Sequence, residues 1–183
     1  LKAEGLPFTL ELIGSGELEP ELRRRVVQAG LEDRVCFLGT MPPEAVRTRM
    51  ERAGIYLFTS GPQEGWGAVL NEAMSSACAV VASAAAGSTP FLVRDGENGY
   101  VYSGADPEGL YRAVRALLED PDRQTRLGRR AYETMAGLWN PETAARRILA
   151  LSQAILDGDP APALFAEGPC SPAPCIREDW YQV

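Results

Sequence analysis

The 183-residue sequence contains no histidine. This absence excludes Ser-His-Asp and Cys-His catalysis and every histidine-based metal site. No apolar run approaches the roughly 20 residues that a membrane-spanning helix needs, and residues 1–5 lack the features of a signal peptide. With 45% hydrophobic and 23% charged residues, the chain has the composition of a soluble globular protein and the length for one substantial domain.

Cysteine is scarce, and the four residues fall into two contexts. Cys36 and Cys78 lie in apolar, strand-like runs, where a free thiol behaves as a small apolar side chain. Cys170 and Cys175 lie in a Pro-rich tail with no second pair of ligands, so their spacing argues against a zinc site. We expect reduced thiols in a cytoplasmic protein and no bound metal.

Positive charge is in the minority. The chain carries 18 Lys and Arg residues against 25 Asp and Glu residues, which gives a net charge of −7. This balance argues against a general nucleic-acid binder. An anionic ligand would need local hydrogen-bond donors, because the overall field of the protein repels it.

What the sequence does contain is a regular alternation of short apolar runs and amphipathic segments. These predict β-strands at residues 8–13, 35–38, 55–58, 79–82 and 100–102, and helices at residues 20–30, 42–52, 68–77, 106–118, 123–135 and 140–156. The alternation indicates an α/β fold, with a Rossmann-like, mainly parallel sheet and helices on both faces. Helical spacing predicts core-facing residues on the first and last helices: Leu22, Val26, Val27, Ile148, Leu151 and Ile155.

The two ends of the chain differ from its middle. Residues 1–5 have the pattern of the last turn of a helix that stops at Gly5, so we expect the domain, residues 1–156, to lack its first strand and helix. The first strand of a doubly wound sheet is central. We therefore expect a gap between the strands at Phe8 and Ile55, filled by upstream residues or by another chain. Residues 157–183 are rich in Pro and Gly and form a C-terminal tail.

The most informative stretch is residues 63–74, which follows the strand at 55–58. Glu64 lies in the loop after this strand, and Glu72 lies inside the next helix, eight positions further along the chain. Ligands collect in open α/β sheets where a strand ends and a helix begins. At a rise of ~1.5 Å per helical residue, the two carboxylates can line one crevice.

Glycines in two loops would allow the backbone to approach a ligand. Gly65 and Gly67 flank Trp66, and the free N–H groups of the following helix point outwards. Carboxylates that accept hydrogen bonds and N–H groups that donate them suit a sugar or a ribose. In an equally open interpretation, Trp66 packs the loop and the two glutamates are a helix cap and a solvated acid. Gly14 and Gly16 could cradle a phosphate or form a tight turn, but a third glycine that a dinucleotide site needs is missing.

Taken in order, residues 8–156 resemble the C-terminal, donor-binding half of a retaining family-4 glycosyltransferase with the GT-B fold. The most specific match is Glu64-Gly-Trp-Gly-Ala-Val-Leu-Asn-Glu72, which fits the family's E-x7-E signature. Residues 12–17 and 37–39 and the start of the last helix at Trp139 support it. The resemblance implies an enzyme, a transferase of the hexosyltransferase type, that acts in polysaccharide biosynthesis.

By resemblance, the domain binds a nucleotide-diphosphate sugar, a UDP- or GDP-sugar, and needs no cofactor or metal. Glu64, which is also the residue assigned to catalysis, and the backbone of Trp66, Gly67 and Ala68 would contact the sugar, and Glu72 the ribose. The complete implied set, with the residues near the phosphates and the base, is Gly14, Gly16, Gly39, Thr40, Met41, Glu64, Gly65, Trp66, Gly67, Ala68, Val69, Leu70 and Glu72.

The resemblance also implies a mechanism and a cellular setting. The sugar passes to an acceptor with retention at the anomeric carbon, and catalysis comes from positioning and from stabilisation of the departing diphosphate. In the alternative mechanism Glu64 is a nucleophile, which conflicts with its binding the far hydroxyls of the sugar. A glycan or glycolipid acceptor would be held by an absent N-terminal domain, with peripheral association of the full-length protein at the inner membrane face. We expect weak donor binding and no transfer by residues 1–183 alone.

The sequence departs from the family pattern at two places. The Gly-Gly-x-Pro-Glu element reads Gly87-Ser88-Thr89-Pro90-Phe91 here, so its acid is missing. The Arg and Lys that bind the donor phosphates in the family belong to the absent first strand-helix unit. Two alternative functions remain open: a nucleotide-sugar 2-epimerase, which would make a new sugar isomer without an acceptor, and a non-catalytic sugar-nucleotide-binding domain.

Overall fold

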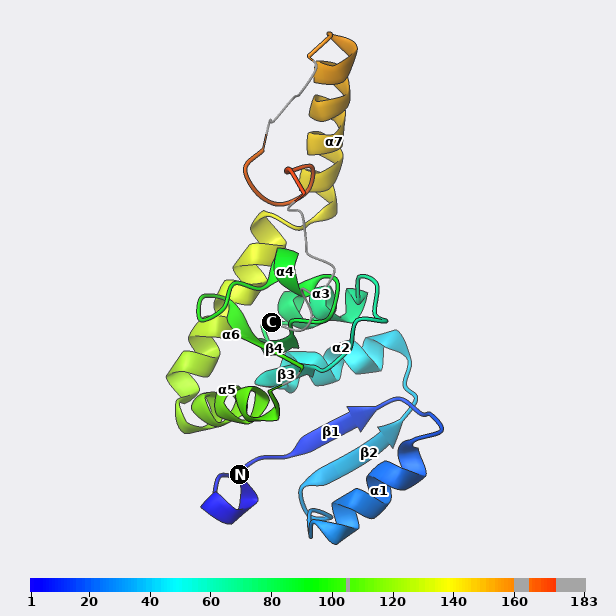
Figure 1. Cartoon of the computed structure of the whole chain (residues 1–183), viewed down its shortest axis with the longest axis vertical. Helices are drawn as coiled ribbons and strands as arrows, with labels where there is room; N and C mark the ends of the chain where they lie inside the picture. Colours follow the sequence, from blue (N-terminus) through cyan, green and yellow to red (C-terminus); the bar gives the residue numbers. More distant parts are fainter. Residues whose placement is uncertain (105, 160–164, 174–183) are drawn as a thin grey trace.

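The computed structural model describes residues 1–104, 106–159 and 165–173 (Figure 1). Cys175 and the rest of the tail after residue 173 lie outside the described residues. The elements are η1 (Lys2–Glu4), β1 (Leu10–Ile13), α1 (Glu19–Gln28), β2 (Val35–Gly39), α2 (Pro43–Arg52), β3 (Ile55–Phe58), α3 (Ala68–Ser75), β4 (Ala79–Ser83), α4 (Thr89–Leu92), β5 (Gly99–Tyr102), α5 (Pro107–Glu119), α6 (Pro121–Gly137) and α7 (Pro141–Leu156).

All strand pairings among the described residues are parallel, but they form two sheets rather than one. β1 pairs with β2, and β3, β4 and β5 form a second sheet with β4 in the middle. The α/β class with helices on both faces is therefore confirmed. The break falls between β1 and β3, where the strand order predicts a gap. In Figure 1, α2 lies between the β1–β2 pair and the rest of the molecule.

The core surrounds β4, which is buried along its whole length. Val80 and Ala82 face one cluster, which contains Phe58 of β3 and Leu70 of α3. Ala79 and Val81 face the opposite side, where Leu117 of α5 and Leu127 of α6 cover the sheet. Because β4 has apolar layers on both sides, its first four residues, 79–82, form an unbroken apolar run rather than an alternating one.

The β1–α1–β2 unit is covered much less well, and here two expectations are wrong. Leu22 and Val27 of α1 are 43% and 60% exposed instead of facing a core. Cys36 is exposed rather than packed, because it lies opposite Glu11 in the register, on the face where Glu11 binds Arg49 of α2. No residue of β1, α1 or β2 is buried.

The last helix also differs from expectation. α7 projects away from the body of the molecule (Figure 1), and Ile148 and Ile155 are exposed. The tail turns back along α7: Arg147 Nη1 donates to the carbonyl of Pro169 at 3.2 Å and to the carbonyl of Glu167, and its guanidinium lies 4.5 Å from the centre of the Phe165 ring. The described part of the tail is thus packed against the helix rather than loose.

Candidate functional site

The loop between β3 and α3 has a backbone that only glycine accommodates at its end. Gly67 has φ +72°, and a Cβ built there would lie 2.4 Å from the Phe58 ring. Gly67 is also the residue before the first turn of α3, and no side chain caps this helix. Among the described residues, the N–H groups of Ala68 and Val69 have no hydrogen-bond acceptor, while the Leu70 N–H donates to the Gly67 carbonyl at 2.9 Å. The positive end of the helix dipole is therefore open to a ligand.

Both acids of the E-x7-E stretch are exposed. In the sequence, Glu64 precedes the start of α3 and Glu72 follows it. Within the described part of the chain, neither the Glu64 nor the Glu72 carboxylate makes a hydrogen bond or ion pair with a side chain. Glu72 lies within electrostatic reach of β3: burial, together with Cys78 and Glu72, raises the pKa of Tyr56 to about 12. Carboxylates can accept hydrogen bonds from hydroxyls, and free N–H groups can donate to an anionic group.

The loops that follow β3 and β4 touch each other. A Cβ at Gly87 would lie 1.7 Å from the Gly65 carbonyl oxygen, and the Gly87 N–H approaches the Glu64 carbonyl at 3.4 Å. Gly87 is the first residue of the Gly-Ser-Thr-Pro-Phe element, which differs from the family pattern. Only glycine at this position allows the backbone to approach the Gly65 carbonyl so closely. This contact brings the segment that carries Glu64 against the carboxyl end of the central strand.

Trp66 belongs to an aromatic cluster that the sequence did not reveal. Its ring centre lies 5.7 Å from that of Phe91 in α4 and 5.8 Å from that of Trp139. Its Nε1 donates to Asn71 Oδ1 at 2.9 Å, and the residue is still 40% exposed. Trp66 therefore packs the loop, as one interpretation held, while part of its indole stays exposed. Contacts between residues so far apart in sequence leave no local signal; Trp139 was marked only by the family resemblance.

The glycines of the first two strands form a separate group. The Gly14 N–H donates to the Gly39 carbonyl at 2.8 Å, which joins the loops after β1 and β2. Both glycines have positive φ, and a Cβ at Gly14, Gly16 or Gly39 would meet nothing within 4 Å. Thr40 is exposed and Met41 half-buried beside them. The strand arrows of β1 and β2 in Figure 1 point toward the side on which the loop before α3 lies.

The predicted residues do not all lie on an accessible surface. The Leu70 side chain is completely buried in the core. That this residue lies near the phosphate and ribose of the donor stays a prediction. Gly65, Ala68 and the two glutamates are exposed, and Val69 is half-buried. A hollow of about 700 Å³ lies elsewhere, between α6 and residues 94–98, and none of the predicted donor residues lines it. Among the described residues, β3 has no strand beside it on the side away from β4.

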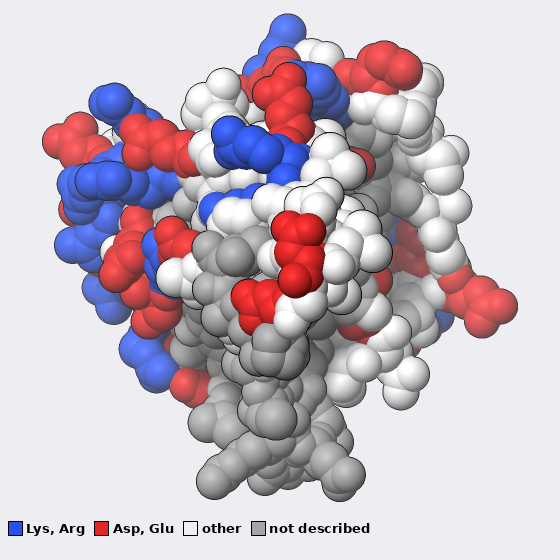
Figure 2. All heavy atoms as spheres, turned by 90° about the horizontal axis from the view of Figure 1, so that it is seen from above, with Lys and Arg blue, Asp and Glu red and all other residues white. Residues whose placement is uncertain are grey.

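The charge distribution gives no broad basic surface for an anion on the face in Figure 2. Acidic and basic side chains lie next to one another there, over α5 and α6 on the left of the view and elsewhere. On α6, for example, Arg129 pairs with Glu133 at 2.9 Å. A diphosphate would therefore depend on local N–H donors such as those at the start of α3.

Comparisons with known proteins identify the family of the chain. Residues 1–134 match the family of glycosyl transferases group 1. The lipopolysaccharide core biosynthesis glycosyltransferase LpsE of Rhizobium meliloti is 32% identical over 143 residues, which cover 78% of this chain and 41% of the relative. The lipopolysaccharide core biosynthesis mannosyltransferase LpcC of Rhizobium leguminosarum is 35% identical over 136 residues, which cover 74% of this chain and 38% of the relative.

Solved structures share the fold. Anabaena Alr3699/HepE in complex with UDP aligns with a TM-score of 0.72 and 24% identity, over 83% of this chain and 43% of that chain. The C-terminal domain of a group 1 glycosyl transferase, LpcC of Francisella tularensis, aligns with a TM-score of 0.65 and 20% identity, over 76% of this chain and 91% of that domain. The chain thus spans about two fifths of the length of the curated relatives. Because the family match covers well over half of its residues, the chain belongs to the glycosyl transferases group 1.

Proposed function

We propose that this domain binds the nucleotide-diphosphate sugar of a glycosyltransferase that transfers a hexose to an acceptor with retention of configuration. The observation that carries the proposal is the start of α3, where exposed Glu64 and Glu72 flank a helix N-terminus whose first N–H groups have no partner among the described residues. Hydroxyls donate to carboxylates, and phosphates accept from helix N-termini. The E-x7-E spacing of a retaining family-4 enzyme supports this assignment.

The donor lies across the carboxyl ends of the strands. Glu64 and the backbone of residues 65–68 bind the sugar, and Glu72 binds the ribose. The diphosphate lies against the first turn of α3, and residues 39–41 border the base. The nucleotide is a uridine or guanosine diphosphate. The closeness of the 84–88 loop to the Gly65 carbonyl supports a fixed position of Glu64 beneath the sugar.

Transfer relies on positioning more than on a protein nucleophile. The bond between the anomeric carbon and the diphosphate breaks as the acceptor hydroxyl oxygen bonds to the same face of the sugar, which retains the configuration, and the hydroxyl proton passes to the departing diphosphate. The N–H groups of α3 stabilise the charge that develops on the departing diphosphate. Glu64 holds sugar hydroxyls, and this role keeps its carboxylate away from the anomeric carbon.

The chain spans about two fifths of the length of its curated relatives. We propose that a further domain holds a glycan or glycolipid acceptor, and that a strand outside residues 1–183 completes the sheet between β1 and β3. The two-part sheet and the two-fifths coverage of the relatives support this proposal. Among the described residues, no helix has the length and apolar character to cross a membrane. We place the enzyme in the cytoplasm, with its acceptor at the inner membrane face, in the biosynthesis of a polysaccharide or lipopolysaccharide.

Calorimetric titration with UDP-glucose and GDP-mannose tests donor binding. We expect weak binding of one of the two, and about a tenfold loss of affinity in Glu72→Gln, because the carboxylate accepts charge-assisted hydrogen bonds from the ribose. Glu64→Gln should weaken binding of the sugar nucleotide more than that of the free nucleoside diphosphate. Glu32→Gln, at an exposed position with no hydrogen-bond partner among the described residues, is the control. The proposal is wrong if neither donor binds, or if all three variants lose affinity equally.

A further inference from the structure

The loop that carries Glu64 has few hydrogen bonds of its own. Between β3 and α3, the Glu64 N–H donates to the Gly61 carbonyl at 3.0 Å, and the long 3.4 Å approach of the Gly87 N–H to Glu64 adds little. Residues 61–66 are exposed, apart from the cover on Trp66. A loop with so little backbone support moves unless side chains fix it.

The Trp66 side chain fixes the loop. The indole contacts Phe91, on α4, and Trp139, between α6 and α7, and it donates to Asn71 in the second turn of α3. These three partners come from three different segments of the chain. Aromatic pairs with ring centres 4.5–7 Å apart attract each other beyond the effect of their burial, so both ring contacts stabilise the position of the indole.

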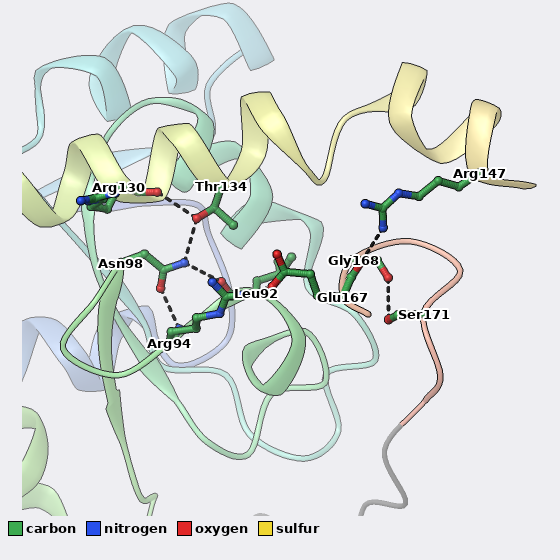
Figure 3. A network of polar contacts seen from close by, with 9 residues as sticks. All are labelled: Leu92, Arg94, Asn98, Arg130, Thr134, Arg147, Glu167, Gly168 and Ser171. Carbon is green, nitrogen blue, oxygen red and sulfur yellow. Dashed lines mark hydrogen bonds and ion pairs between the residues drawn. The ribbon is translucent and has the colours of Figure 1, made fainter. Parts of the chain in front are cut away.

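Hydrogen bonds tie the segments that carry the two aromatic partners to their neighbours, and Figure 3 shows those of Asn98. The buried amide of Asn98 donates to the Leu92 carbonyl at 3.0 Å and to Thr134 Oγ1 at 3.1 Å, which ties the end of α4 to the last turns of α6. Asn140 accepts from the Thr143 N–H at 2.8 Å, and its own amide donates to the Ala136 carbonyl at 2.7 Å. The chain between α6 and α7 is therefore fixed on both sides of Trp139.

The C-terminal tail also contacts the segment between α6 and α7. Gly168 lies so close to Leu138 that a Cβ there would come within 2.6 Å of Leu138 Cδ1. Glu167 pairs with Arg94, and Arg147 of α7 holds the carbonyls of Glu167 and Pro169, as Figure 3 shows for Glu167. Trp139 directly follows Leu138 in the chain. The contacts of the tail therefore support the position of the Trp139 ring, against which Trp66 packs.

We propose that Phe91 and Trp139 are positioning residues: they hold Trp66 and thereby present Glu64 and the N–H groups of residues 65–67 in one fixed arrangement. As far as the donor sugar is the ligand of this arrangement, the inference rests on the proposed function. Phe91 occupies the position where the family carries an acid.

Hydrogen exchange of the whole 183-residue chain tests the positioning role without any ligand. We expect amides of residues 60–67 to exchange about tenfold faster in Trp139→Leu and in Phe91→Ala, because each variant removes one ring contact. The amides of β4 should exchange as in the wild type, which also establishes that both variants are folded. Tyr132→Ala, which removes an exposed aromatic side chain from α6, is the matched control. Unchanged exchange of residues 60–67 in both variants would overturn the inference.

Calorimetry with UDP-glucose and with UDP separates this inference from the proposed function. A positioning role predicts that Trp139→Leu loses about tenfold in affinity for UDP-glucose and much less for UDP, and that Trp139→Phe recovers most of the loss. A general loss of structure would weaken both ligands alike. If the wild type binds neither a uridine nor a guanosine donor, the proposed function fails, and the exchange experiment still decides whether Phe91 and Trp139 position the loop.

Discussion

At the scale of single residues, the candidate site depends on glycines as much as on acids. The acids are simply exposed, whereas Gly67 and Gly87 occupy places that no other residue fits. At Gly87 a side chain would collide with the Gly65 carbonyl, and at Gly67 it would collide with the Phe58 ring in a backbone conformation that L residues avoid. These two positions allow the loops after β3 and β4 to meet at the start of α3.

Gly67→Ala should therefore destabilise the protein. The left-handed conformation and the displacement of the Phe58 ring together cost about 2–4 kcal/mol of unfolding free energy. Urea unfolding, followed by tryptophan fluorescence, measures the change. Gly61→Ala serves as control, because Gly61 lies in the same loop with open space around it and no positive φ. Equal stability of the two variants would contradict this account of the loop.

How far the sequence predicts single residues depends on whether a neighbour in sequence or in space decides their environment. Exposure of Glu64 and Glu72 follows from a loop and a helix start, both visible in the local pattern. The environments of Trp66 and Cys36 do not, because Phe91, Trp139 and Glu11 are far from them in the chain. The sequence could have predicted the burial of Leu70, because Leu70 lies three residues after Gly67 and four before Met74, at the helical spacing of a core residue.

At the scale of elements, apolar runs locate the strands well. The run at 55–58 is β3, and the fully apolar run at 79–82 is the central strand, only one residue longer than predicted. Asn140 followed by Pro141 marks the start of α7, and the Asn140 side chain does accept from the Thr143 N–H. The sequence shows an apolar face on α1 and on α7, but the prediction that these faces pack against a core is wrong. Periodicity identifies an apolar face of a helix without saying what covers it.

One buried amide joins several elements and offers a test at this scale. Asn98 makes three hydrogen bonds, because it also accepts from the Arg94 N–H at 2.7 Å. Asn98→Ala leaves the Arg94 N–H and the Leu92 carbonyl without these partners and should lower the free energy of unfolding by about 2–3 kcal/mol. Thermal unfolding followed by circular dichroism measures the loss.

A second variant at this position distinguishes the hydrogen bonds from the space they fill. Asn98→Asp has nearly the same size and keeps an acceptor for the Arg94 N–H, but it loses the donors to Leu92 and Thr134 and buries a charge. It should destabilise the protein at least as much as Asn98→Ala does. Near-wild-type stability of Asn98→Asp would mean that the amide donors contribute little.

At the scale of the whole molecule, the described chain has two parts that differ in how much they bury. Residues 55–137, from β3 to the end of α6, contain every buried hydrophobic residue of the described chain except Met50, which α2 contributes to the same core. The β1–α1–β2 part, residues 8–41, has a two-stranded sheet and no buried residue in its strands or helix. The Arg49–Glu11 ion pair, at 2.8 Å, joins this part to α2. It adds little to the stability of the part, because both side chains are more than a third exposed.

The two parts should therefore open independently. A two-stranded sheet is marginally stable by itself, so amides of β1 and β2 should exchange with solvent about 10–100-fold faster than those of β4 under native conditions. Hydrogen exchange with mass spectrometry resolves both sets in one experiment, with β4 as the internal reference. Similar protection of β2 and β4 would show that α2 couples the parts more tightly than the exposed contacts imply. In the full-length protein, the strand that we propose between β1 and β3 would pair with both edges, and the difference in exchange should disappear because the sheet then opens as one unit.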